Sequence, residues 1–224
     1  MPSEPTPAPR PELRAKVLEL ARQAPAPPRA DVQKRTRALL AAGLTLPIAL
    51  FALFGGAEQG PRPGLLMLLT FGGTLAIAGL ALWGALSRGG RMLGRARSWL
   101  VVVAVLPAAL LLVWKVGSSA AFPYMTQAWP TRPGFRCFGM SLLFGVVPLI
   151  AFLIARRGSD PVHPRALGAA LGAAGGLWAA SLVDLWCPVA FPWHVVLGHV
   201  LPALLLATLG GVLGARLLGP SSRD

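Results

Sequence analysis

The chain has 224 residues, of which 54% are hydrophobic and 13% charged, with a net charge of +13. This composition is too apolar for a soluble domain of this length and is typical of a membrane protein. Two cysteines exclude a disulfide-rich scaffold, and no C-x-x-C pair marks a structural zinc site.

The chain begins with a mostly polar tail that contains one short amphipathic segment. Residues 11–22 start with a proline suited to a helix N-terminus and place Leu13, Val17 and Leu20 at helical spacing. A helix this short is marginal alone in water, so it needs a partner that buries its apolar side. Anionic lipid and a soluble protein both remain open as that partner, although two glutamates in the segment weaken the lipid alternative.

Six apolar windows follow, and a helix needs about 20 apolar residues to cross a bilayer. They lie at 38–54, 64–86, 98–116, 137–155, 166–186 and 195–215. We therefore predict an all-α, polytopic membrane protein with six transmembrane helices. Its parts are a tail at 1–37 with a short amphipathic helix, a membrane domain at 38–217 and a C-terminal tail at 218–224. Glycines four residues apart in the last two windows predict close packing between these helices.

The distribution of lysine and arginine predicts the orientation. The tail, the second and fourth loops and the C-terminus hold 17 of them, whereas the other side holds 4. Because cytoplasmic loops carry the excess of positive charge, we expect both termini in the cytoplasm and a location in the bacterial inner membrane.

Two cysteines and two histidines are predicted to lie at the outer face, where an oxidising compartment is expected. Cys137 opens the fourth helix, Cys187 closes the fifth, and His194 and His199 lie near the start of the sixth. Asp184 is the only acidic residue within the six windows, which marks it as a candidate accessory group. Three alternatives stay open: a disulfide or redox-sensing pair, independent packing, and a soft-metal site. We favour the cysteine pair over metal because histidines five residues apart would point to different helix faces.

Enzymes are excluded by the absence of their usual motifs. The sequence has no phosphate-binding loop, no H-E-x-x-H and no G-x-S-x-G, and it indicates no cofactor or chromophore site. The middles of the predicted spans are almost bare of ionisable groups, which disfavours ion transport. A small transporter or channel, or a structural membrane subunit, is the alternative to a regulator. His163, in a predicted cytoplasmic loop, is assigned no chemistry.

The C-terminal half resembles the NrsF-type membrane anti-sigma factors, which are six-helix proteins with a short cytoplasmic N-terminal segment. The likeness lies in Arg-Cys-Phe-Gly at 136–139, in Asp-Leu-Trp-Cys-Pro at 184–188, and in the stretch from His194 to Pro202 with its paired histidines. Length, topology and the basic tail extend the resemblance over most of the chain.

The resemblance implies a negative regulator of transcription that sequesters an extracytoplasmic-function sigma factor and releases it on an oxidative, metal or light-derived signal. Cys137 and Cys187 would be the signal-responsive pair, and the tail, through Leu13, Val17 and Leu20, would bind the sigma factor. A related membrane anti-sigma factor controls light-induced carotenoid synthesis. No direct contact with nucleic acid is expected, whereas the sigma partner, the stimulus, the mode of release and the oligomeric state are not predicted.

Overall fold

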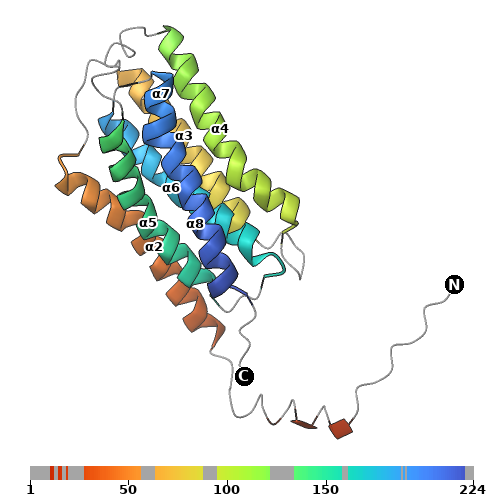
Figure 1. Ribbon diagram of the computed structural model, residues 1–224. Coiled ribbons are helices and arrows are strands. Elements are labelled where there is room, and N and C mark those ends of the chain that lie inside the picture. Colours follow the sequence, from red (N-terminus) through yellow and green to blue (C-terminus); the bar gives the residue numbers. More distant parts are fainter. Residues whose placement is uncertain are drawn as a thin grey trace, which may run out of the picture. The chain divides into compact units, whose positions relative to one another are not determined.

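The computed structural model describes residues 11–12, 15–16, 19, 28–56, 64–87, 95–121, 134–157, 161–187, 189 and 191–219. Its helices are α2 (Arg29–Leu53), α3 (Gly64–Leu86), α4 (Arg97–Ala121), α5 (Phe135–Arg156), α6 (Pro164–Trp186), α7 (Pro192–Val195), the π-helix η2 (Val196–Val200) and α8 (Leu201–Leu217). No strand occurs among the described residues (Figure 1). The predicted all-α class is confirmed.

Among the residues that the structure describes, six helical stretches are long and apolar enough to cross a membrane, which agrees with the predicted six spans. α7, η2 and α8 follow one another without a break and together form the last of these stretches, Pro192–Leu217. α2 begins at Arg29, earlier than the expected start at 38, because the basic residues before the apolar run are good helix formers and continue the helix. The chain is a multi-pass membrane protein.

The chain divides into two compact units, 1–36 and 37–224, and the membrane helices from residue 37 onward belong to the second. Within this unit α6 is the central helix, because it contacts α3, α4, α5 and α8 (Figure 1). Of its apolar window, 83% is buried, a larger share than in any other span described. Nearly half of the residues of α6 are alanine or glycine, so its neighbours can approach its backbone closely.

The predicted close packing of the last two helices is confirmed for α6 and α8. A Cβ atom on Gly172 would meet the backbone carbonyl oxygen of Leu206, and one on Gly176 would lie 2.7 Å from the Cα atom of Ala203. Gly168 and Gly210 likewise lie against each other's backbone. Only glycine fits at these positions, and the contact joins α6 to α8 over most of their length.

We therefore predict that Gly172→Leu destabilises the bundle by more than about 3 kcal/mol, because the obstacle is the backbone of α8, which cannot move aside as a side chain can. The matched control is Gly72→Leu on α3, where nothing lies within 4 Å of the added Cβ atom. Thermal unfolding in detergent, followed by circular dichroism, measures both variants. Equal stability of the two variants would contradict this account of the α6–α8 contact.

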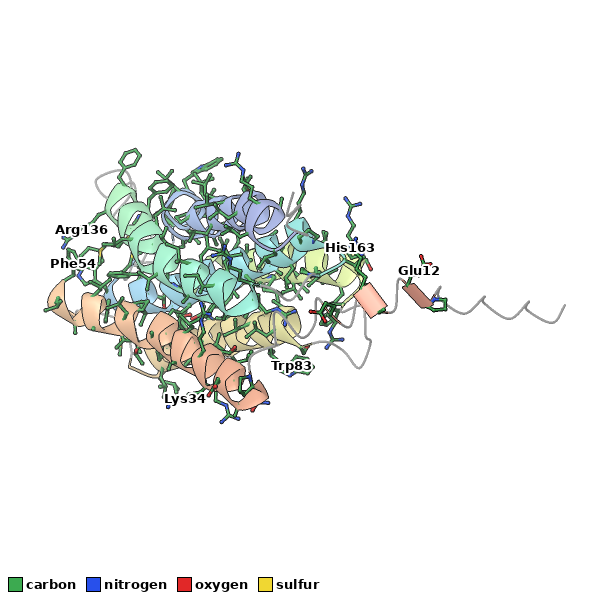
Figure 2. The ribbon with its side chains drawn as sticks, turned by 90° about the horizontal axis from the view of Figure 1, so that it is seen from below. Glu12, Lys34, Phe54, Trp83, Arg136 and His163 are labelled. Carbon is green, nitrogen blue, oxygen red and sulfur yellow. The ribbon has the colours of Figure 1, made fainter. Side chains whose placement is uncertain are left out.

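The two ends of the bundle carry different residues. Phe54 and Arg136 lie at one end, whereas His163 lies at the opposite end (Figure 2). The guanidinium carbon of Arg136 lies 4.2 Å from the ring centre of Trp186, so α5 and α6 meet at the first of these ends. Cys137 and Cys187 lie at this end, because they directly follow Arg136 and Trp186. His194 and His199 lie there too, since their ring nitrogens are within 4.8 Å of the two sulfurs.

Candidate functional site

Four buried side chains converge where α5, α6 and α7–η2 meet. Cys137 lies in the first turn of α5, Cys187 directly follows α6, His194 lies in α7 and His199 in η2. Their sulfur and nitrogen donor atoms all lie within 4.8 Å of one another. The sulfur of Cys187 is 3.1 Å from Nε2 of His194. We call these four residues the Cys/His cluster.

The π-helix brings the two histidines together. In an α-helix, residues five apart are separated by about 140° around the axis, so the sequence led us to expect different faces. That expectation is wrong, because the i to i+5 geometry of η2 turns His199 to the side of His194. The two rings lie 5.8 Å apart, centre to centre. Both histidines can therefore face one metal ion together with the two cysteines.

Small residues of α5 hold the π-helix in place. The hydroxyl of Ser141 donates a hydrogen bond of 3.1 Å to the carbonyl oxygen of Gly198, in the middle of η2. A Cβ atom on Gly198 would lie 3.0 Å from the Cβ atom of Cys137, so glycine permits this approach. Gly134, the N-cap of α5, has a φ of 104° and packs against the carbonyl oxygen of His194. The start of α5 and the π-helix are therefore fitted to each other around the cluster.

Two thiols and two imidazoles form a donor set suited to soft or borderline metal ions such as zinc, cadmium or copper(I). His199 is fully buried, and neither of its ring nitrogens has a hydrogen-bond partner among the described residues. An orphaned buried polar group needs an explanation, and a bound ion would supply one. Both cysteines are free thiols, and their sulfurs are close enough for a disulfide to form after a small movement.

Asp184, the predicted accessory residue, has a different role from the cluster. Its carboxylate forms an ion pair with the ammonium group of Lys115 on α4, and both side chains are at most 2% exposed. Lys115 lies near the end of the predicted window 98–116, where its charge was counted with the outer side, and its pairing with Asp184 was not predicted. Asp184 itself indicates such a partner in the sequence, because a carboxylate inside a membrane span is usually paired with a cation. The pair joins α4 to the last turn of α6, directly before Cys187.

We expect that breaking this pair on one side costs about 3–5 kcal/mol of stability, because the remaining charge would be buried alone. Asp184→Asn and Lys115→Met each remove one partner, and thermal unfolding in detergent measures the loss. The double variant, Lys115→Met with Asp184→Leu, leaves no buried charge and should regain most of the stability. A double variant less stable than both single ones would contradict a simple ion pair.

The other residues named from the sequence are the three predicted sigma-binding residues of the tail and His163, to which no chemistry was assigned. Leu13, Val17 and Leu20 lie outside the described residues. His163 lies at the opposite end of the bundle from the cluster (Figure 2).

The fold and the site together define a class, a six-helix membrane protein whose buried thiols and imidazoles gather at one end of the bundle. Its family is known. The chain belongs to the NrsF family, described as negative regulator of sigma F, which matches residues 20–219. The predicted resemblance is confirmed, and the family is one of regulators.

The chain is also similar to a protein named for its part in carotenoid synthesis. The chain is 35% identical over 187 residues to the carotenogenesis protein CarR of Myxococcus xanthus, an alignment that covers 81% of this chain and 75% of the relative. No solved structure matches the chain. The family and this relative support a regulatory role in the membrane.

Proposed function

We propose that this protein is an anti-sigma factor of the bacterial inner membrane that sequesters an extracytoplasmic-function sigma factor and releases it on a signal read by the Cys/His cluster. The family description supports a sigma-factor partner. The tail is the sigma-binding segment, through Leu13, Val17 and Leu20, which their spacing in the sequence predicts on one side of a short helix. Both termini lie in the cytoplasm in this proposal, as the positive charges favour, and the cluster then lies near the periplasmic surface.

The observation that carries the sensing role is the convergence of four soft donor atoms within 4.8 Å of one another at one end of the bundle. A membrane domain that only anchored the tail would not require this arrangement. We propose a soft or borderline metal ion as the signal. Oxidation of the two cysteines to a disulfide is the second candidate, favoured by their free thiols and their proximity.

The contacts of the bundle suggest how a change at the cluster would reach the cytoplasm. η2 continues directly into α8, and α8 packs against α6 as far as the start of α6, where a Cβ atom on Gly214 would lie 2.5 Å from the carbonyl oxygen of Pro164. A metal ion that pulled His194 and His199 toward the cysteines would shift η2 against α5. Because α8 and α6 are tightly packed, the shift would be passed on to the opposite end of the bundle.

The metal proposal is tested with the full-length protein in detergent, titrated with Cd²⁺ and followed by the ultraviolet absorption of cadmium–thiolate bonds. We expect one ion per chain. His199→Ala removes a direct ligand of the metal. It should therefore weaken binding more than loss of a residue that only hydrogen-bonds to a ligand, which costs roughly 10- to 100-fold in affinity. His163→Ala, at the other end of the bundle, is the matched control.

Cd²⁺ binding as tight in Cys137→Ser with Cys187→Ser as in the wild-type protein, measured by isothermal titration calorimetry, would exclude the cluster as the metal site. If the wild-type protein bound no cadmium but formed a disulfide between Cys137 and Cys187 on treatment with hydrogen peroxide, the second candidate would replace the first.

A further inference from the structure

The helices α4, α6 and α8 enclose a groove that the Cys/His cluster does not use. Its volume is about 920 Å³, which lies within the roughly 300–1,000 Å³ of typical ligand sites. Its wall is largely apolar, with Val101 and Val105 from α4, Ala166 and Ala169 from α6, and Leu204 and Val212 from α8. In a membrane such a wall is suited to contact with a hydrocarbon chain.

Three arginines line the same groove, and each comes from a different helix. Arg97 begins α4, Arg165 lies in the first turn of α6, and Arg216 lies in the last turn of α8. No acidic residue occurs among the described residues that line the groove. The three arginines therefore lie at helix ends beside one groove, and its lining holds no carboxylate to balance their charge.

Two of these arginines lie where the dipole of their own helix disfavours a positive charge. The N-terminus of a helix carries partial positive charge, so a cation in the first turn is unfavourable. Arg97 and Arg165 both occupy first turns, and neither first turn contains an acidic residue. An anion bound between the arginines would offset this cost. Arginine is also well suited to phosphate, because its planar fork of donors matches two phosphate oxygens.

We propose that this groove binds an anionic phospholipid, with the phosphate headgroup held by Arg97, Arg165 and Arg216 and one acyl chain lying along the apolar wall. Basic pockets between transmembrane helices are known to select acidic lipid headgroups. The bound lipid would join α4 to α6 and α8 at the end of the bundle opposite the Cys/His cluster. The proposal does not depend on the sigma-binding role of the tail.

The test uses the full-length protein in detergent and native mass spectrometry, with phosphatidylglycerol and phosphatidylcholine as competing lipids. We expect the wild-type protein to prefer phosphatidylglycerol. The ratio of phosphatidylglycerol to phosphatidylcholine affinity should fall roughly a hundredfold in the triple variant Arg97→Gln, Arg165→Gln, Arg216→Gln. Each basic residue raises the affinity for anionic lipid several-fold. The matched control is Arg35→Gln, Arg37→Gln, Arg157→Gln, which removes the same charge from exposed positions outside the groove.

A second variant tests the apolar wall without changing charge. Ala169→Phe places a ring in the groove and should weaken retention of phosphatidylglycerol, while helicity measured by circular dichroism stays at the wild-type value. Equal lipid preference in the triple variant and its control would overturn the proposal. So would competition by inorganic phosphate as effective as that by the lipid, because the groove would then bind the anion alone. Loss of sigma-factor binding in the triple variant, with lipid preference unchanged, would assign the arginines to a protein partner instead.

Discussion

Leu13→Asp with Val17→Asp, introduced into the full-length protein, is expected to abolish binding of the sigma factor and to leave its target genes constitutively active. A Leu or Val side chain contributes about 1.5–3 kcal/mol when fully buried, and a carboxylate in its place would have to be desolvated. Two such changes on one side of a short helix should lower the affinity by more than about a hundredfold. Titration of the purified sigma factor against the detergent-solubilised protein measures the loss.

The matched control adds the same two negative charges to the tail outside the amphipathic segment, as Ser3→Asp with Gln23→Asp. This variant should bind the sigma factor almost as tightly as the wild-type protein. If both double variants bound equally well, the apolar side of the segment would not be the docking surface. Membrane insertion, checked by cell fractionation, distinguishes lost binding from lost protein.

Cys137→Ser with Cys187→Ser is expected to keep the sigma factor sequestered under every stimulus. The hydroxyl groups occupy almost the same space as the thiols but bind soft metal ions poorly and form no disulfide. Basal repression should therefore persist, while induction of a sigma-dependent reporter by cadmium, copper or peroxide falls to the uninduced level.

His163→Ala serves as the control in the reporter experiment, because His163 lies at the opposite end of the bundle from the cluster (Figure 2). Full induction in the double cysteine variant would show that the cluster is not the sensor. Constitutive induction in that variant would indicate instead that the thiols are needed to hold the repressing state.

The number and places of the membrane helices could be predicted from the sequence, because apolar stretches of this length have no other stable arrangement in a bilayer. The contact of α6 with α8 was also predictable, since glycines four residues apart lie on one face of each helix. The boundary of α2 was not, because polar residues continue a helix without any apolar signal. The assignment of domains, including the tail at 1–37, stays a prediction.

The geometry of the site depended on features that a sequence pattern does not contain. The π-helix η2 contacts α5 through Gly198 and Ser141, and histidines five residues apart give no sign of such a helix in the sequence. The partner of Asp184 lies on α4, 69 positions earlier in the chain by residue number, so only the requirement for a cation could have pointed to Lys115. The arginine groove combines residues from three helices distant in sequence.

The most direct test of the central proposal is co-purification of the full-length protein with its cognate sigma factor from solubilised membranes, before and after addition of cadmium. We expect the sigma factor to remain bound without the metal, to be released from the wild-type protein when cadmium is added, and to stay bound to Cys137→Ser with Cys187→Ser. Failure of the intact protein to bind any sigma factor would contradict the proposed function.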